Sequence, residues 1–590
     1  MGIGTTGKGG GRTAVALVLT SALLTSCASL PESVADAVDS ATTQARCSGL
    51  AAAALMDAPV DGLTVTSSTW IAAGTPVGAG PQAMTDLPGH CVVEGFYGTH
   101  EGVIGGPYRT GFRMRLPEDW NGRFLFQGGG GSNGVVGDAT GSNGAGNAPA
   151  LQRGYAVIAQ DSGHDNDTNT LPSHQGQLVF GFDPQSRRDY GHSSLKPTND
   201  LAHHLMRAFY GRDSGTDLFW GCSKGGQEGM AFAQRYPEAF DGIVAMAPGM
   251  SLPRAALAEA WDVQAFAGVL EKRGEQPTLA GLQSLFSPAQ SANIQSAIMS
   301  ACDGLDGAED GMISQAGACT TARVEPALRQ RQCTAESPAD GCLQGDQIDA
   351  TVTVMGGPRS SSGEQLYAPW AWDAGVAAPG WNVWKVGLQG GPPALNVLLG
   401  GGSLSAVFTT PPTPLGSNPD DFLKWQMGLD FDRDAQKIYA VAPPFTTSAW
   451  QDVGMRSPDL SAFRAAGGKM IVPHGTSDPV FSVLDTIAWW QEVDGASAGR
   501  AADFARVFPV PGMNHCAGGP ATDRFDSLSA LENWVLNDRA PDRIMASAGA
   551  ETPFPGREVP LCAWPKVAIA DPGSEPRSYR CAMPPKALPL

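Results

Sequence analysis

The sequence predicts an α/β fold in which a parallel β-sheet, covered by helices on both faces, is interrupted by one large insertion. Short apolar segments typical of buried strands alternate with helical segments over residues 46–251 and again over 453–590. The alternation stops over residues 252–452, where glycine–proline clusters, tryptophans and four cysteines are concentrated. We therefore expect a core domain built from both flanking segments and a lid domain built from residues 252–452.

The expected strands each end in a glycine-rich or polar loop, which is where an open parallel sheet places its active site. The loop after the first of them is a run of four glycines, and polar side chains follow the others. The strands are expected at residues 123–126, 155–159, 217–220, 242–246, 469–472 and 506–510, with helices near 197–210 and 225–235.

Composition and charge exclude some classes of partner. The 590 residues carry a formal net charge of −19, which argues against binding to nucleic acid and against attraction to an anionic lipid surface. Glycine (75 residues) and proline (45 residues) are frequent, which indicates many loops and tight turns. We expect a small molecule as the partner.

The first residues have the pattern of an export signal. Lys8 and Arg12 precede an apolar stretch, residues 13–25, that is too short to cross a bilayer as a helix. Residues 24–27, at and just after its end, resemble a lipoprotein cleavage box with Cys27 as its cysteine. Residues 1–27 therefore predict a signal peptide and residues 28–45 a polar tether. We expect an outer-membrane lipoprotein or a periplasmic or extracellular protein, attached to a membrane only if Cys27 carries lipid. The alternative is ordinary signal cleavage nearby.

The nucleophile is expected at Ser223. Residues 221–225 match the pattern G-x-S-x-G between a predicted strand and a predicted helix, which is the structural context that this motif requires. A sharp turn holds the serine hydroxyl clear of the sheet, and glycines allow the close backbone approach that such a turn needs. The following helix directs its free N–H groups at the position where an oxyanion forms.

The acid and the base are expected later in the chain, in that order. Asp478 follows the strand at 469–472, and His515 follows the strand at 506–510. His474 is the rival base, but it lies on the same loop as Asp478, whereas the fold places the histidine one strand later. We expect His164 and His192 to be structural.

The oxyanion hole is expected to use the backbone N–H groups of Gly131 and Lys224. Gly131 ends the four-glycine loop, and Lys224 directly follows the nucleophile. The alternative is that the glycines form only a flexible loop.

The cysteines offer a check that is independent of the motif. Without Cys27 there are ten, enough for five disulfide bonds in an oxidising compartment, although the sequence does not fix their pairing. Cys222 and Cys516 flank Ser223 and His515, so contact between serine and histidine forces these cysteines close enough to bond. Nearest neighbours suggest the other pairs: Cys47–Cys91, Cys302–Cys319, Cys333–Cys342 and Cys562–Cys581.

An acidic loop at residues 303–312 predicts a structural calcium site in the lid. Hard oxygen ligands on a tightly turning, glycine-containing loop suit Ca²⁺, although the spacing differs from that of an EF-hand. The alternative is a solvated acidic turn. The expected ligands are the carboxylates of Asp303, Asp306 and Asp310 and the carbonyl groups of Ala308 and Met312.

Taken together, these motifs resemble the tannase and feruloyl esterase family. The resemblance rests on residues 221–226, 303–312, 474–478 and 511–516 and extends from about Cys47 to the C-terminus. It implies an α/β-hydrolase core with a large calcium-bearing lid, the triad named above, five disulfide bonds and aromatic carboxylic esters as substrates. It also supports the disulfide bond beside the triad.

The resemblance also implies a substrate pocket with walls from the lid. Family members that hydrolyse a terephthalate monoester bind its free carboxylate with a lid arginine. The corresponding position here falls near Leu395, and residues 360–432 contain no arginine. Loss of a bidentate carboxylate clamp disfavours an anionic substrate. The implied pocket residues are Trp381, Leu399, Ser403, Leu252 and Ala255.

The sequence thus predicts a serine carboxylesterase that hydrolyses feruloyl, galloyl or hydroxybenzoyl esters through an acyl-enzyme. Hydrolysis of a terephthalate monoester is the alternative within the same class. A non-catalytic, calcium-binding surface lipoprotein and a peptidase are alternatives from other classes.

Overall fold

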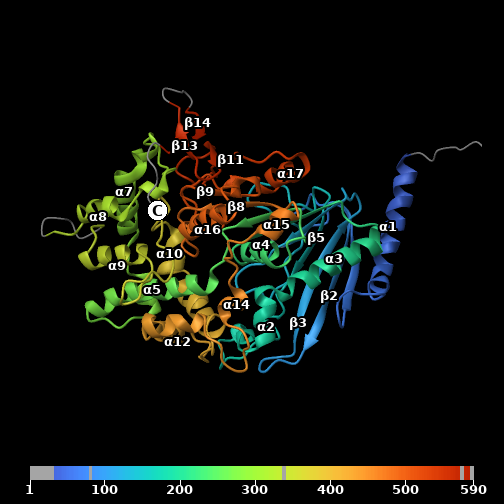
Figure 1. Cartoon of the computed structure of the whole chain (residues 1–590), viewed down its shortest axis with the longest axis horizontal. Helices are drawn as coiled ribbons and strands as arrows, with labels where there is room; N and C mark the ends of the chain where they lie inside the picture. Colours follow the sequence, from blue (N-terminus) through green and yellow to red (C-terminus); the bar gives the residue numbers. More distant parts are fainter. Residues whose placement is uncertain (1–31, 79–82, 335–340, 572–576, 585–590) are drawn as a thin grey trace, which may run out of the picture. The chain divides into compact units, whose positions relative to one another are not determined.

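The computed structural model describes residues 32–78, 83–334, 341–571 and 577–584 (Figure 1). The chain divides into two compact units, Met1–Thr43 and Gln44–Leu590. The expected signal peptide and Cys27 lie outside the described residues. Helix α1 (Glu32–Ala54) includes most of the segment expected as a tether, so residues 32–45 are helical, and their role as a tether stays a prediction. The segment is rich in alanine, which has the highest helix propensity.

A nine-stranded sheet forms the centre of the larger unit. Its strand order is β1-β2-β3-β5-β4-β6-β7-β8-β9. Strands β1 to β3 pair antiparallel, and from β5 to β9 the strands are parallel. The strands are β1 (Thr64–Ile71), β2 (His90–His100), β3 (Tyr108–Pro117), β4 (Arg123–Gln127), β5 (Ala156–Gln160), β6 (Thr216–Cys222), β7 (Gly242–Met246), β8 (Lys469–Gly475) and β9 (Ala505–Val510).

The strand order reverses at β4, which lies between β5 and β6. From β4 the chain first adds β5 on one side and then returns to add β6 on the other. The loops after β4 and β6 therefore leave the same edge of the sheet side by side, which is the position where open α/β sheets bind ligands. This topology confirms the predicted α/β fold.

Helices cover both faces of the sheet, as the apolar strands predict. Phe124 and Phe126 pack on one face, whereas Leu125 between them packs on the other, and all three are fully buried. The first face is covered by α3 (Leu195–Tyr210), α4 (Lys224–Arg235) and α16 (Val483–Ala496), and the second by α17 (Ser527–Asn537).

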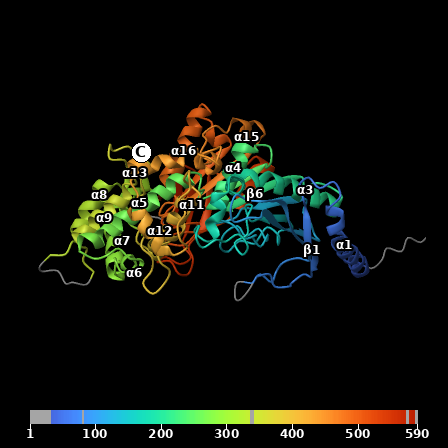
Figure 2. The ribbon, with the colours of Figure 1, turned by 90° about the horizontal axis from the view of Figure 1, so that it is seen from below.

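In its described residues, the segment between β7 and β8 consists of helices and loops. Most of the helices gather on one side of the sheet in both views, in green to orange, whereas α15 lies next to α4 (Figures 1 and 2). The helices are α5 (Leu252–Lys272), α6 (Leu279–Gln283), α7 (Pro288–Cys302), α8 (Thr321–Arg329), α9 (Gly345–Met355), α10 (Pro379–Lys385), α11 (Gly402–Ala406), α12 (Pro419–Met427), α13 (Phe431–Asp434), α14 (Ala449–Val453) and α15 (Ser461–Ala465). Contacts group this segment with the sheet in a single compact unit.

Smaller elements complete the chain. A short helix, α2, lies before α3, and two small sheets follow the main one. Their bounds are α2 (Pro184–Arg188), β10 (Arg524–Phe525), β11 (Arg543–Ser547), β12 (Glu558–Cys562), β13 (Val567–Ala570) and β14 (Tyr579–Ala582). Within the described residues, every helix is too short or too polar to cross a bilayer.

Candidate active site

Ser223 occupies a strained turn between β6 and α4. Its backbone has φ 65° and ψ −122°, a left-handed conformation that side-chain-bearing residues seldom adopt. Glycine is required on both sides, because a Cβ atom on Gly221 would lie 2.6 Å from the Gly225 backbone, and one on Gly225 would lie 2.6 Å from the carbonyl oxygen of Gly129. The sequence therefore folds here into the turn that the motif predicts.

The structure brings the three predicted triad residues into one hydrogen-bonded chain. His515 Nε2 lies 2.8 Å from Ser223 Oγ, and His515 Nδ1 lies 2.8 Å from Asp478 Oδ2. Ser223 follows β6, Asp478 follows β8 and His515 follows β9, so all three leave the same edge of the sheet. The geometry suits proton transfer from the serine to the imidazole.

Asp478 is held as a buried carboxylate. Its Oδ1 atom accepts hydrogen bonds from the backbone N–H groups of Val480 (2.8 Å) and Phe481 (3.0 Å). Burial by itself would raise the pKa of Asp478, but the attraction of His515 and hydrogen bonds from His474 and His515 outweigh burial and lower that pKa below its usual range. The carboxylate therefore stays ionised beside the imidazole.

His474, the rival base, lies behind Asp478. It is fully buried, with Nδ1 2.9 Å from Thr486 Oγ1 and Nε2 3.0 Å from the Phe481 carbonyl oxygen. Both ring nitrogens are thus engaged away from the serine. Of the two histidines expected to be structural, His164 stacks on Phe180 at 3.8 Å, and burial lowers its pKa to about 3.

All five expected disulfide pairs are formed in the structure. Cys222 and Cys516 are bonded, with their Cα atoms 6.1 Å apart, although they are 294 residues apart in sequence. This bond ties the residue before the nucleophile to the residue after the base. The other pairs are Cys47–Cys91, Cys302–Cys319, Cys333–Cys342 and Cys562–Cys581.

Asp373, from the inserted segment, is a site residue that sequence analysis missed. Its fully buried carboxylate accepts hydrogen bonds from the hydroxyl groups of Thr476 and Ser477, on the acid loop, and from the N–H of Gly512 (2.6 Å), on the base loop. One side chain therefore holds both loops together. An isolated aspartate in a tryptophan-rich stretch carries no local signal of this role.

The predicted oxyanion residues lie beside the nucleophile. Gly131 and Lys224 line the same cavity as Ser223, and Gly131 has φ 57°. The Lys224 ammonium group is buried and pairs with the Glu228 carboxylate at 2.9 Å, which also accepts the N–H of Gly129 at 2.9 Å. This pair anchors the four-glycine loop next to the first turn of α4.

The cavity beside Ser223 has aromatic walls and encloses about 470 Å³ including its open mouth. Trp384 and Phe481 meet the His515 ring edge to face, with centroids 5.6 and 5.3 Å away. The described residues that line the cavity are Gly131, Ser132, Tyr190, Ser223, Lys224, Leu252, Ala256, Glu259, Trp384, Leu399, Ser403, Phe408, Val480 and Phe481.

Two of the five expected pocket residues need correction. Leu252, Leu399 and Ser403 line the cavity, but Trp381 and Ala255 do not. Trp381 is 2% exposed and packs on Phe266 of α5, and Ala255 is 1% exposed. Helix geometry gives the reason. Residues three apart on α10, such as Trp381 and Trp384, and neighbours on α5 lie at different angles around the helix, and the sequence does not fix which face meets the cavity.

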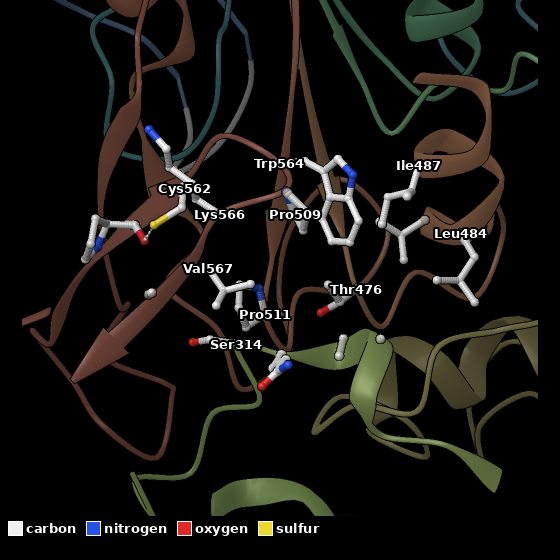
Figure 3. A pocket seen from close by; sticks show the side chains of 16 residues that line it. Ser314, Thr476, Leu484, Ile487, Pro509, Pro511, Cys562, Trp564, Lys566 and Val567 are labelled. Atoms are coloured by element: carbon white, nitrogen blue, oxygen red, sulfur yellow. Dashed lines mark hydrogen bonds between the residues drawn. The ribbon is translucent and has the colours of Figure 1, made fainter. Parts of the chain in front are cut away.

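A second cavity lies behind the acid loop (Figure 3). Figure 3 shows Thr476, Pro511 and Trp564 around a mainly apolar space, with Leu484 and Ile487 of α16 at one side. Among the described residues that line it, none belongs to the triad. The chemistry is therefore assigned to the cavity that contains Ser223.

The acidic loop contains the three carboxylates that the sequence analysis assigned to calcium. The Asp306 carboxylate accepts the N–H groups of Ala308 and Ser314, and burial, together with the repulsion of Asp310 and Asp303, raises the pKa of Asp306 to about 6. Nowhere in the described part of the chain do three acidic, histidine or cysteine side chains gather as a metal site by themselves. A cation here therefore needs backbone carbonyl groups as additional ligands, which the sequence analysis assigned to Ala308 and Met312.

Comparison with known proteins identifies the family. A profile described as "Tannase and feruloyl esterase" matches residues 104–581. The chain belongs to the tannase and feruloyl esterase family. It is 41% identical, over 525 residues that cover 85% of this chain and 86% of the relative, to a mono(2-hydroxyethyl) terephthalate hydrolase from Piscinibacter sakaiensis. Membership makes the chain a carboxylic ester hydrolase.

Solved structures confirm the α/β-hydrolase fold. Feruloyl esterase B from Aspergillus oryzae matches with a TM-score of 0.71 and 23% identity, covering 92% of this chain and 100% of that chain. Tannin acyl hydrolase from Aspergillus niger matches with a TM-score of 0.64 and 20% identity, covering 90% and 94%. At these identities the likeness concerns the fold.

The position of the Cys222–Cys516 bond predicts an effect on both stability and activity. Replacing both cysteines by serine should lower the free energy of unfolding by about 2–5 kcal/mol, because the bond closes a very long loop. It should also lower kcat on 4-nitrophenyl acetate, because the loop that carries Ser223 is no longer joined covalently to the loop that carries His515. Urea unfolding and steady-state kinetics measure the two effects.

The matched control replaces Cys333 and Cys342 by serine. These residues are only 9 apart in sequence, and their bond lies at neither the nucleophile nor the base, so kcat should be unchanged. Equal loss of kcat in both double variants would contradict the assigned role of the Cys222–Cys516 bond.

Proposed function

We propose that the protein is a serine carboxylesterase that hydrolyses neutral esters of aromatic carboxylic acids through an acyl-enzyme. The observation that carries the proposal is the hydrogen-bonded chain Ser223–His515–Asp478 at a cavity with aromatic walls. Such a chain activates a hydroxyl group that is otherwise a weak nucleophile.

In the first step, His515 Nε2 takes the proton of Ser223 Oγ, and that oxygen attacks the ester carbonyl carbon. The backbone N–H groups of Gly131 and Lys224 stabilise the negative oxygen of the tetrahedral intermediate. His515 then returns the proton to the departing alcohol. Asp478 holds the imidazole in the tautomer that accepts at Nε2 and stabilises its positive charge.

In the second step, water enters where the alcohol left. His515 takes a proton from the water, the resulting hydroxide attacks the acyl carbon, and the proton returns to Ser223 Oγ as the carboxylic acid is released. The steps repeat the first half of the reaction with water in place of the alcohol, so the same residues serve both halves.

The walls of the cavity support an aromatic, uncharged acyl group. Trp384, Phe408 and Phe481 offer flat or edge contacts to a ring. Among the described residues that line the cavity, Lys224 is the basic one, and its ammonium group is already paired with Glu228. No arginine occurs in residues 360–432 to bind a substrate carboxylate.

Hydrolysis of a terephthalate monoester is the second candidate. The 41% identity to a mono(2-hydroxyethyl) terephthalate hydrolase favours it. The lining of the cavity disfavours a terephthalate monoester, because the free carboxylate of that substrate would meet no unpaired cation among the described lining residues.

We also propose that the acidic loop binds a structural Ca²⁺ ion and that the protein is exported. The hard oxygen donors of Asp303, Asp306 and Asp310 support the first proposal. The five disulfide bonds support the second, because such bonds persist in oxidising compartments. Attachment to lipid at Cys27 remains a prediction from the sequence.

Substitution of the nucleophile tests the mechanism. Ser223→Ala should lower kcat on a benzoate ester by about 10⁴-fold or more, because the attacking oxygen is removed. The variant should also lose covalent labelling by a fluorophosphonate probe, followed by mass spectrometry of the intact protein.

The matched control is Ser403→Ala, which removes a different serine from the same cavity and should still be labelled. Labelling of Ser223→Ala, or turnover near the wild-type rate, would refute the assignment. Absence of labelling in the wild-type protein would instead favour a non-catalytic binding protein.

A panel of esters tests the substrate class. At pH 7, kcat/KM for methyl ferulate or methyl gallate should exceed that for mono(2-hydroxyethyl) terephthalate by about tenfold or more, the scale expected when a charged group lacks a partner. A higher kcat/KM for the terephthalate monoester would establish the second candidate function.

Removal of calcium tests the metal proposal. Addition of a chelator should lower Tm by several degrees, because an ion that binds only the folded chain stabilises it, and added Ca²⁺ should restore Tm. The double variant Asp303→Asn/Asp306→Asn should show the lower Tm with or without chelator. A wild-type Tm that is indifferent to the chelator contradicts the proposed site.

A further inference from the structure

Glu259 is a buried acidic side chain in the substrate cavity that lacks a partner. It lies on α5, is 5% exposed and lines the cavity that contains Ser223. In the part of the chain that the structure describes, no hydrogen bond or ion pair reaches its carboxylate; Lys385, Asp262 and Asp478 act on it only as more distant charges. A buried polar group normally has a partner, so this one requires an explanation.

The carboxylate is fixed in place by close packing. A Cβ atom built on Gly400 would lie 2.1 Å from Glu259 Oε2. Gly400 belongs to the helical turn Asn396–Gly401, next to the cavity residue Leu399. The absence of a side chain at Gly400 therefore makes room for the Glu259 carboxyl group, which any larger residue at this position would displace.

Nearby cations are committed to other carboxylates. Lys385 Nζ lies 2.5 Å from Asp262 Oδ2 and 3.6 Å from the centroid of the Trp370 ring, and Lys224 pairs with Glu228. Burial raises the pKa of Glu259 to about 8, against the attraction of Lys385. The group thus lacks the contacts that normally stabilise a buried carboxyl, and a ligand that supplies an N–H or O–H donor would compensate.

We propose that Glu259 accepts a hydrogen bond from a hydroxyl or amino substituent on the aromatic ring of the substrate. This inference rests on the proposed function and deepens it, because it names the substituent that the cavity selects. A phenolic hydroxyl group supplies the missing donor. An unsubstituted or methoxylated ring, or a ring that carries a carboxylate, supplies no such donor and leaves the acceptor oxygen of the carboxyl group unpaired.

A site built to pair a substrate donor discriminates strongly, because the analogue without the donor leaves a buried group unsatisfied. Removing only the carboxyl group should therefore abolish the preference without removing activity. The residues that carry out acyl transfer lie on the loops after the strands, whereas Glu259 lies on α5. We therefore assign Glu259 to substrate specificity and not to the bond-making steps.

The experiment compares three methyl esters at pH 7: methyl 4-hydroxybenzoate, methyl 4-methoxybenzoate and monomethyl terephthalate. For the wild-type protein, kcat/KM for the hydroxy ester should exceed that for the methoxy ester by about tenfold or more, the scale of leaving a buried polar group without a hydrogen-bond partner. Glu259→Leu should bring this ratio close to one, mainly through a higher KM for the hydroxy ester.

Two further variants keep the test decisive. Glu259→Gln preserves size and one acceptor oxygen, so it should fold and keep part of the hydroxy preference. Ser403→Ala removes another polar group from the cavity wall and should leave the hydroxy-to-methoxy ratio unchanged. Fluorophosphonate labelling of each variant shows that Ser223 is still assembled.

The outcomes separate this inference from the function on which it rests. An unchanged substituent ratio in both Glu259 variants, with normal labelling, overturns the role of Glu259 and leaves the esterase proposal standing. A ratio that collapses in Ser403→Ala instead assigns recognition to Ser403. Labelling of Ser223 without turnover of any of the three esters overturns the aromatic substrate class and this inference with it.

Discussion

The hydrogen bond between Ser223 and His515 joins residues 292 positions apart, and the rest of the site is organised around keeping that contact short. The sheet brings the loops after β6, β8 and β9 to one edge, but loops are the mobile parts of a fold. Two devices restrict them here. The Cys222–Cys516 bond joins the serine turn to the histidine loop, and the Asp373 carboxylate joins the histidine loop to the aspartate loop. Covalent and polar constraints thus act on different pairs of the same three loops.

Buried charge follows a consistent pattern around the cavity. Lys224 pairs with Glu228, Lys385 pairs with Asp262, and Asp478 is surrounded by donors. In each case the low-dielectric interior makes an isolated charge costly and a well-placed partner effective. Glu259 departs from this pattern at the place where a substrate would lie, which is why the specificity of the site is best sought there.

Sequence alone predicted the features whose signals are local or topological. The turn at residues 221–225, the strands that precede Asp478 and His515, and the cysteines that flank Ser223 and His515 all follow from short patterns combined with the order of strands in a sheet. The pocket walls were predicted less well, because Trp381 and Trp384 differ only in their angle around α10. Asp373 and Glu259 carried no signal, since their roles depend on contacts with residues about 100 or more positions away. The helical conformation of residues 32–45 was not predicted, because a polar composition suits both a helix and an irregular segment.

The bond between Cys222 and Cys516 has a practical consequence for producing the protein. Thiol groups stay reduced in the cytosol of most cells, so a chain made there would lack this bond. The contact between Ser223 and His515 would then depend on packing and hydrogen bonds. Preparations from a reducing host and from an oxidising one would then share a sequence and a sheet yet differ in specific activity. Free sulfhydryl groups should therefore be titrated in every preparation used for kinetics, to show that the disulfide bond has formed.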